Sequence, residues 1–513
     1  MAFESDFKPE LRLHPLSWLF ALSAYVRQLI VPILAFLFLG ARDDGELWGV
    51  IFFAPLLIGA LWQQWMYRYG FGPRGLVIHY GFLFRNVRMI EYARIENIDV
   101  ERGVLHRLLG VARVSIATST GGKPEASIRV LSLEAVQELR ERIFQQHHPS
   151  AERAQTSPAR DEVLLNLGPA ELVRFGLIDN RGIIVVAALF GFLAQNGNLF
   201  ELLATRAGMW LHDSPLSIVA AMGFAMQAAL LVSLLMGFIL LLRILSIAIA
   251  LVTLFDFTLS RHAEDFRIRH GLLTRVALTL RVRRVQAVHQ TATLLHRLFS
   301  RVSLRVDLAG DSGGGEEKQG QSQTRARWLA PICRPDQAGS LIAAALPDAD
   351  LDRKPDWQPL APGARARIFR RSVYLGVLLA VISVVVLHLV PEAPFTPGLE
   401  AIGVALALVM GISWLRAHLY VKYTRWALTQ DAILFEHGWL TRRLVVAPRN
   451  RLQSVKISQS PFDQRSFMAN VSLDTAGGSS MRDSIRIPLL PVKVAQQLAN
   501  ALYRSHVVEL SRR

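Results

Sequence analysis

Cysteine is almost absent from this sequence, which has Cys333 as its one thiol among 513 residues. No internal disulfide can form, so the polar parts of the chain need no oxidising compartment to fold. A zinc site built from several thiolates is excluded too, and the 14 histidines form no HExxH or comparable cluster. The sequence therefore predicts no metal site and no cofactor.

Two other kinds of motif are missing. The glycine-rich segment "SGGGEEKQG" lacks the Lys-Ser/Thr pair of a phosphate-binding loop, and no helix is expected after it. We interpret it as part of a flexible polar loop. Basic segments such as "TRRLVV" lack the interleaved aromatic residues of nucleic-acid-binding strands. We expect no enzyme activity, no catalytic residue and no nucleic-acid partner.

Apolar residues, by contrast, are abundant and clustered. They make up 51% of the chain, the mean hydropathy is +0.29, and the longest apolar run is Leu216–Leu242. Because a membrane-spanning helix needs about 20 mostly apolar residues, the sequence predicts an integral membrane protein. Successive runs pair into three predicted transmembrane hairpins, about six helices, at residues 16–66, 172–254 and 372–419. The run that ends at Phe255 is too long for one crossing, so we expect it to continue as a helical stalk.

The net charge of +16 lies outside these runs. Residues 67–146, 255–346 and 420–503 carry excesses of +4, +6 and +6, so three polar blocks account for all of it. The loops between paired runs hold at most one basic residue each. Nucleic acid is one partner for a basic protein, but the positive-inside rule and the anionic cytoplasmic leaflet explain membrane-tethered basic blocks more simply. We therefore expect the blocks and both termini to be cytoplasmic.

The three polar blocks are copies of one another. When Gly81, Gly271 and Gly438 are aligned, the segments read "GFLFRNVRMIEYARIENIDV", "GLLTRVALTLRVRRVQAVHQ" and "GWLTRRLVVAPRNRLQSVKI". An arginine follows each glycine by 13 residues without a gap, and an aliphatic residue comes next. Short segments rich in β-branched residues predict strands, and each block ends in an amphipathic helical stretch. Each repeat is thus expected to be a helical hairpin followed by a small β-sandwich or barrel that one helix closes.

This pattern resembles the bacterial PH-like domain known as bPH2 or DUF304. The resemblance rests on the strand that begins at the aligned glycine and on the segments "ARIENI", "RRVQAV" and "NRLQSV". Three units in one chain are similar to the YdbT-type membrane proteins. The resemblance implies a mixed membrane fold, with three PH-like domains that are each a bent seven-stranded β-sandwich capped by a C-terminal helix. It also implies a multi-pass protein of the bacterial inner membrane and a role in envelope maintenance or stress resistance, with no agreed ligand.

One short motif occurs twice. "LHRL" stands at Leu105–Leu108 and Leu295–Leu298, at equal distances from the aligned glycine. The third copy reads Phe462-Asp463-Gln464-Arg465 at this place. Because a catalytic His-Arg pair should not lose both members in a sister domain, catalysis is the least favoured interpretation. We favour a structural corner, and a contact to an anion or lipid headgroup stays open.

The aligned arginines Arg94, Arg284 and Arg451 are the candidate binding residues. A guanidinium can bind a carboxylate or phosphate through two parallel hydrogen bonds. The structural alternative is an ion pair inside each domain, with Glu96 as the partner in the first copy. The other two copies have glutamine at that position, so this pairing cannot be shared by all three.

Together these features predict a non-enzymatic membrane protein that presents three PH-like domains for binding. The expected partners are anionic lipid headgroups, a partner membrane protein, or another copy of the chain. Two alternatives from other classes stay open. One is a transporter or channel component whose helices are the working part, although the apolar runs contain almost no Asp or Glu. The other, ranked lowest, is a membrane enzyme.

The charge pattern makes a prediction about topology. A reporter fused after residue 146 should give a cytoplasmic signal, and a reporter inserted in the 391–398 loop should give a periplasmic one, because each hairpin crosses the membrane twice. Paired alkaline phosphatase and fluorescent-protein fusions in whole cells measure both. A periplasmic signal from the first fusion would contradict this orientation.

Overall fold

The computed structural model describes residues 11–12, 20, 62, 66–72, 75–80, 86–118, 126–147, 162–195, 205, 223–262, 265–309, 328–350, 355–389, 399–475 and 485–510. The chain divides into two compact units, Met1–Leu280 and Arg281–Arg513. The division falls inside the second repeat, at the end of its strand β11 (Arg275–Arg281), rather than between repeats.

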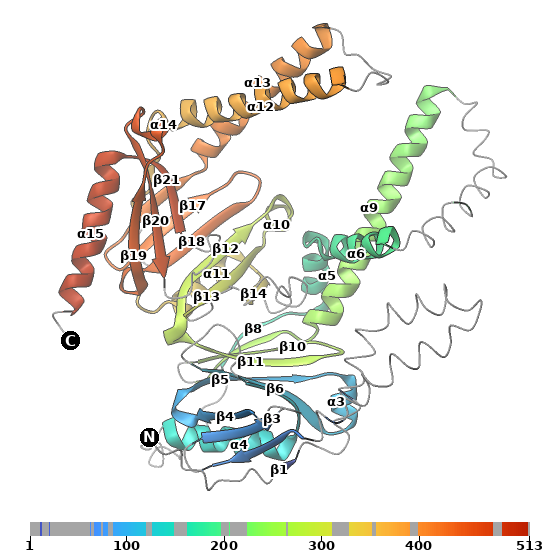
Figure 1. The fold of residues 1–513 in the computed structure, drawn as a ribbon, viewed down its shortest axis with the longest axis vertical. Helices are drawn as coiled ribbons and strands as arrows, with labels where there is room; N and C mark the ends of the chain where they lie inside the picture. The colour runs from blue at the N-terminus through green and yellow to red at the C-terminus, as the bar shows by residue number, and fades with distance from the viewer. Residues whose placement is uncertain are drawn as a thin grey trace. The chain divides into compact units, whose positions relative to one another are not determined.

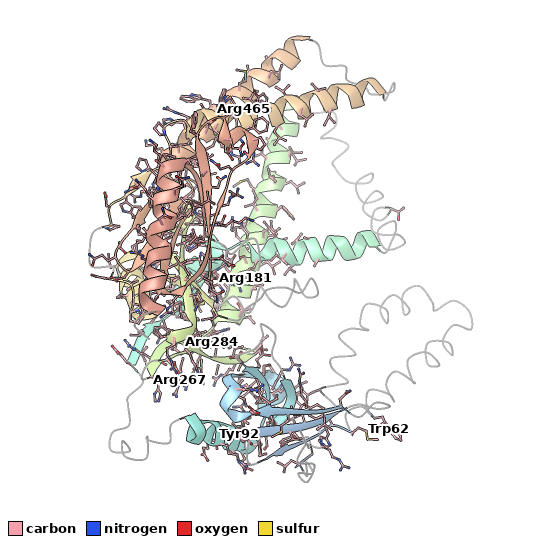
Figure 2. The ribbon with its side chains drawn as sticks, turned by 60° about the vertical axis from the view of Figure 1, so that its left-hand side comes forward. Trp62, Tyr92, Arg181, Arg267, Arg284 and Arg465 are labelled. Atoms are coloured by element: carbon pink, nitrogen blue, oxygen red, sulfur yellow. The ribbon has the colours of Figure 1, made fainter. Side chains whose placement is uncertain are left out.

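The first repeat contains two antiparallel groups of strands. Four strands form one sheet in sequence order, namely β1 (Leu11–Arg12), β2 (Arg68–Phe71), β3 (Gly75–Tyr80) and β4 (Asn86–Glu91). Three strands and a helix follow, namely β5 (Ile95–Arg102), β6 (Val111–Thr118), β7 (Ala126–Ser132) and α4 (Leu133–His147). Tyr92, Ile116 and Leu139 share a core that both groups of strands and α4 enclose. Figure 2 labels Tyr92 within this domain.

The other repeats have the same order of elements. The second consists of β8 (Glu162–Asn166), β9 (Thr258–His262), β10 (Asp265–His270), β11, β12 (Val285–Ala292), β13 (Val302–Leu308), β14 (Trp328–Cys333) and helix α11 (Pro335–Ala345). The third consists of β15 (Gln358–Pro359), β16 (Arg425–Leu428), β17 (Ala432–His437), β18 (Arg442–Pro448), β19 (Leu452–Ser458), β20 (Met468–Thr475), β21 (Ile485–Pro491) and helix α15 (Val492–Leu510). Each repeat therefore has seven strands and a closing helix.

One strand of each repeat comes before its hairpin in the sequence. β1, β8 and β15 each pair antiparallel with the first strand that follows the hairpin, β2, β9 or β16. Domain boundaries drawn at residues 67, 255 and 420 leave these strands out. In each repeat, the chain before the hairpin and the chain after it therefore belong to the same sheet.

Sheets of consecutive repeats are continuous. One seven-stranded sheet has the order β7-β6-β5-β11-β10-β9-β8, and another has the order β14-β13-β12-β18-β17-β16-β15. In the first sheet, β5 of the first repeat pairs with β11 of the second repeat. In the second sheet, β12 of the second repeat pairs with β18 of the third repeat, as Figure 1 shows. We call these strand pairs the first joint and the second joint.

Both joints use the same register. Arg275 lies opposite Arg102 at the first joint, and Arg442 lies opposite Ala292 at the second. Counted from the aligned glycine, the fourth residue of one repeat faces the 21st residue of the preceding repeat in both cases. Ala287 of β12 also packs into the core of the third repeat with Val445 and Leu452, so the second joint is supported by apolar packing.

The aligned glycines have a backbone reason to be glycine. Gly271 and Gly438 have φ angles of 109° and 92°, in the region that side chains with a Cβ rarely adopt. A Cβ at these positions would collide with the carbonyl oxygen of Thr274 or Thr441. The tight turn that follows β10 and β17 therefore requires glycine, and Gly81 lies outside the described residues.

The number of membrane-spanning helices differs from the prediction. Among the described residues, one helix is long and apolar enough to cross a membrane, Ala228–Leu254 within α9 (Phe224–Leu254). The prediction was about six. Helix α6 (Arg181–Gln195) has only 15 residues, and α12 (Ala364–Leu389), which packs on α13 (Leu399–Lys422), has four arginines in its first eight positions. The first predicted hairpin, residues 16–66, lies almost entirely outside the described part of the chain.

Helix α9 has two parts with different surroundings. Every residue from Leu231 to Leu241 is exposed, as expected of a segment that faces lipid. From Leu242 onward the helix is partly covered by α5 (Pro169–Ile178), and Ser246 and Ala250 are buried. The second part is therefore a stalk that connects the apolar part to β9.

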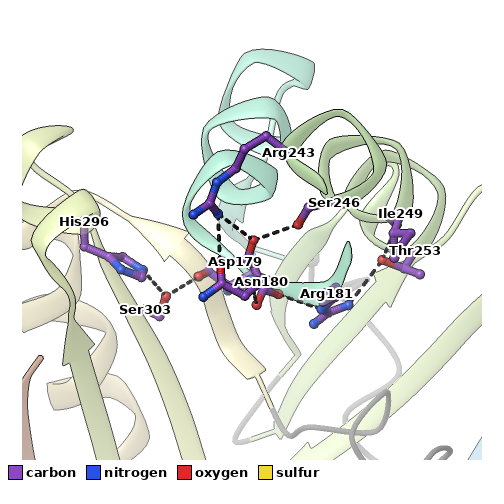
Figure 3. Close-up of polar contacts among 10 residues, drawn as sticks. Asp179, Asn180, Arg181, Arg243, Ser246, Ile249, Thr253, His296 and Ser303 are labelled. Carbon is purple, nitrogen blue, oxygen red and sulfur yellow. Dashed lines mark hydrogen bonds and ion pairs between the residues drawn. The ribbon is translucent and has the colours of Figure 1, made fainter. Parts of the chain in front are cut away.

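A break separates α5 from α6, so the predicted hairpin at 172–254 does not begin with one continuous helix. Arg243 of α9 donates hydrogen bonds to the carbonyl of Leu177 (2.9 Å) and to Oδ1 of Asn180 (2.8 Å). Ser246 Oγ donates to the carbonyl of Asp179 (2.7 Å), as Figure 3 shows. These bonds satisfy carbonyls that the end of α5 leaves without helical partners, and the cation lies where the helix dipole favours it.

Candidate functional site

The three candidate arginines occupy one structural position. Arg94, Arg284 and Arg451 each end a 3-10 turn, at Tyr92–Arg94 (η1), Val282–Arg284 (η3) and Arg449–Arg451 (η4). Each turn connects the last strand of a four-stranded group to the first strand of a three-stranded group. The repeat alignment therefore identified a shared place in the fold, and Figure 2 labels Arg284 as one example.

The partners of the three arginines differ. Arg94 forms an exposed ion pair with Glu91 (3.0 Å), whereas the side chain of Glu96 lies outside the described part. Arg284 donates a hydrogen bond to the carbonyl of Ala309 in its own repeat. The three guanidinium groups therefore do not share a partner that would mark a common ligand site.

Arg451 belongs to the second joint. It donates to the carbonyls of Val282 (3.1 Å) and Val285, which lie on either side of Arg284, and it pairs with Asp348 (2.6 Å). Its side chain is only 11% exposed. The structure thus brings Arg451 to the turn that carries Arg284, and Arg451 acts there as a link between repeats.

The His-Arg motif also lies at the joints. Arg107 is on α3 (Val104–Leu108) and donates a hydrogen bond to the carbonyl of Leu272 (3.4 Å), directly after the aligned glycine of the next repeat. Arg297 is on α10 (Leu294–Leu298) and donates to the carbonyl of Trp439 (3.1 Å), at the same position of the third repeat. The arginine of each motif therefore contacts the repeat that follows it.

The third repeat lacks the motif. Gln464 on α14 (Pro461–Gln464) stands where Arg107 and Arg297 stand. Asp463 replaces the histidine and pairs instead with Arg367 of α12 (2.9 Å). Sequence comparison showed that the third copy differs, but it gave no reason. The structure shows that this arginine, where it is present, contacts the repeat that follows.

The histidine of the motif holds the corner itself. His296 is buried, and its two ring nitrogens lie 2.8 Å from Thr293 Oγ1 and 2.7 Å from Ser303 Oγ. Ser303 Oγ in turn donates to the carbonyl of Pro331 (2.6 Å), and Figure 3 shows the His296–Ser303 contact. Asp463 caps its own short helix in the same way through Ser460. These contacts agree with a structural corner.

Apolar side chains are exposed around the first joint. Leu105 and Leu108 on α3, and Leu272 and Leu273 in the glycine turn, are all exposed, with Leu108 at 80%. The exposed Arg107 and Arg275 lie among them. The first joint thus has exposed apolar and basic side chains next to each other.

The first joint is connected directly to the membrane helix. The Gly271 N–H donates to the carbonyl of Phe255 (2.8 Å), and the Leu272 N–H donates to the carbonyl of Val252 (3.0 Å) at the end of α9. The glycine turn is thereby held at the base of the apolar helix.

The second joint repeats this arrangement with other contacts. Leu294 and Leu298 on α10 and Leu440 in the turn are exposed beside Arg297. The guanidinium of Arg442 lies over the ring of Tyr423, 4.9 Å from its centroid, just after α13. Each joint is therefore anchored to the end of a long helix.

Two histidines that precede the aligned glycines are held neutral. Burial, together with nearby Arg443 and His289, lowers the pKa of His437 to about 4. Burial also lowers the pKa of His270, although a hydrogen bond with the Thr253 carbonyl opposes part of this effect. Burial therefore disfavours a positive charge on both of these histidines.

Asp463 has the opposite behaviour to an ordinary buried acid. Burial alone would raise its pKa, but hydrogen bonds from Ser460 and Arg367 outweigh that effect and hold the pKa below its usual value.

The described part of the chain contains no group of three or more His, Cys, Asp or Glu side chains that could hold a metal ion.

The chain matches the family model of the bacterial PH domain, bPH_2, in three stretches, residues 19–147, 213–334 and 375–506. It is 20% identical over 495 residues to the UPF0699 transmembrane protein YdbT of Bacillus subtilis (strain 168). That alignment covers 92% of this chain and 94% of the relative. No solved structure matches the chain. The three stretches agree with three tandem repeats.

The joint arginines make a first prediction. Arg107→Gln with Arg297→Gln, which gives both motifs the residue found at Gln464, should loosen each joint by about 1 kcal/mol or less, because one exposed charged hydrogen bond is lost. Hydrogen exchange of the β5–β11 and β12–β18 amides should become faster in the full chain. Arg465→Gln, at an exposed position beside Gln464, is the matched control and should change neither rate.

The neutral His437 makes a second prediction. The unfolded chain binds a proton at this residue near pH 6.5 and the folded chain only near pH 4, so stability is greatest above pH 6.5 and falls by up to about 3 kcal/mol as the pH drops towards 4. Denaturant unfolding of the third repeat in the full chain measures this loss. In His437→Gln the slope between these pH values should become smaller, and an unchanged slope would rule out His437 as its source.

Proposed function

The chain belongs to the bacterial PH domain family, and we propose that its joints are contacts to an anionic membrane surface. On this proposal the protein is a non-enzymatic, multi-pass protein of the bacterial inner membrane. Its helices hold three cytoplasmic PH-like domains at the bilayer, where the joint arginines attract lipid headgroups. A role in envelope maintenance or stress resistance goes with this proposal.

The observation that carries the proposal is the hydrogen bond between Leu272 N–H and the Val252 carbonyl. It fixes a turn with exposed leucines and arginines to the stalk of a helix that can span a membrane. From Leu242 to Val252 the helix advances about 15 Å at about 1.5 Å per residue. The headgroup layer takes up about 6 Å of this distance, and the surface potential extends about 8 Å further at physiological salt.

These distances decide which interaction matters more. The joints lie about 9 Å beyond the headgroup layer, roughly one Debye length from it, where the leaflet's electrostatic field is weakened but still present. Arginine attraction, at less than about 1 kcal/mol for each residue at this distance, is therefore the main contribution, and leucine insertion is secondary. Because several joint arginines act on one tethered chain, weak contacts add together.

The candidate arginines enter the proposal unequally. Arg94 is exposed and remains available to an acidic partner or a headgroup. Arg284 and Arg451 already donate to backbone carbonyls, so we assign them to support of the joints. No described contact favours a transport pathway, since Arg243 in α9 is engaged by the break between α5 and α6.

Lipid composition tests the proposal. The full chain is placed in nanodiscs of phosphatidylglycerol or of phosphatidylcholine, and hydrogen exchange is followed at α3, α10 and the two glycine turns. Exchange should slow in phosphatidylglycerol, and about 0.5 M salt should remove the difference by screening. Arg275→Gln with Arg443→Gln should weaken the effect, because both side chains are exposed at the joints.

Lys493→Gln provides the matched control, since it removes an exposed charge from the capping helix α15. It should leave the lipid difference intact. Equal exchange of the joint segments in both lipids would reject the headgroup contact.

A further inference from the structure

Among the described strands, β4 and β19 have no partner on the edge that their counterparts in the other repeats use for pairing. β11 and β18 are each paired with a strand of the preceding repeat, and β4 is the equivalent strand of the first repeat. β5 and β12 are each paired with a strand of the following repeat, and β19 is the equivalent strand of the third repeat. Among the described strands, β4 and β19 are terminal in their sheets.

The side chains on these two edges show what the missing pairing leaves uncovered. At the second joint Val446 lies opposite Val288, and both are buried, at 1% and 0% exposed. Met89 holds the position of Val446 in the first repeat and is 52% exposed. Val87, two residues earlier on the same face, is 64% exposed. At the position of Met89, the first repeat thus exposes an apolar side chain where the second joint buries one.

The common register of the joints says which residues would meet if β19 and β4 paired. Continuing the same alignment places Ile457 opposite Val87 and Val455 opposite Met89. Both pairs fall on one face of the sheet, because alternate residues of a strand point the same way. Ile457 is exposed too, so the two edges offer matching apolar surfaces.

We propose that β19 of one chain pairs with β4 of a second copy of the same chain, in the register of the two internal joints. The occupant is a second copy because this edge pair is already used twice within the chain. The contact is head to tail, so an open assembly of any size keeps one free β4 edge and one free β19 edge. Assemblies should therefore form a series of sizes unless the chain of copies closes into a ring.

Two features make this contact weaker than an internal joint. Lys456 would lie opposite Arg88, and like charges opposite each other on adjacent strands are unfavourable. The first joint tolerates a similar pair, Arg102 opposite Arg275. In addition, Gln464 replaces the arginine that links each internal joint to the next glycine turn. The proposal therefore describes reversible association, and it does not depend on contact with lipid.

Cysteine crosslinking between two tagged full-length chains tests the proposal. One chain carries Val87→Cys and the other Ile457→Cys, both are expressed together, and oxidation is carried out in native membranes. Directly opposed residues have Cβ atoms about 5 Å apart, close enough for a short crosslink. A covalent product with both tags should appear at twice the 57.3 kDa of one chain.

The control moves the register by one residue. Val87→Cys with Ser458→Cys places the two thiols on opposite faces of the paired strands, so the crosslink should fall several-fold. Unsubstituted chains, in which Cys333 is buried, should give none. Equal crosslinking of the matched and shifted pairs, or a product of Val87→Cys chains alone, would overturn the proposal.

Two further variants are expected to increase association, a result that misfolding of the chain could not produce. Lys456→Glu should raise the crosslinked fraction by facing Arg88 with an opposite charge, and Gln464→Arg should raise it by restoring the arginine of the internal joints. Mass photometry of the wild-type chain in nanodiscs provides a second measurement. Only single chains in wild-type and both variants, or capture of a different protein at the β19 edge, would reject a second copy as the occupant.

Discussion

The structure depends on backbone pairing between the sheet edges of consecutive repeats. An open edge presents unpaired N–H and C=O groups, and pairing with the next repeat satisfies them in a fixed register. This pairing explains why the compact units do not coincide with the repeats. β11 is joined to β5 of the first repeat and β12 to β18 of the third, so the second repeat contributes strands to both units.

The joints also explain which residues the repeats keep. Gly271 and Gly438 allow the turn that approaches the preceding repeat, and Arg107 and Arg297 bind the carbonyl directly after those glycines. The third repeat has Gln464 at this position instead. A residue repeated inside one chain can thus mark an internal boundary between repeats.

The sequence was sufficient for features that depend on local pattern. The three repeats, their strands and their capping helices follow from periodicity, because α4, α11 and α15 bury one face at helical spacing. Two of the three early strands, β1 and β15, have only two residues and carry no periodic signal, so no pattern in the sequence revealed them. The break between α5 and α6 depends on Arg243, more than 60 residues away in the sequence. The roles of Arg94, Arg284 and Arg451 diverge because alignment identifies equivalent positions and says nothing about the partners that tertiary structure brings to each.

The weakness of the free edges is consistent with a protein held at a membrane. A strongly complementary edge on a mobile chain would aggregate without control, and natural sheets limit this with charged edge residues such as Lys456 and Arg88. Attachment to a bilayer confines copies to a thin layer and raises their effective concentration, so a contact too weak to form in solution can form there. Surface contact through the joints and edge pairing between copies would then reinforce each other, because lipid binding orients every chain in the same way relative to the membrane.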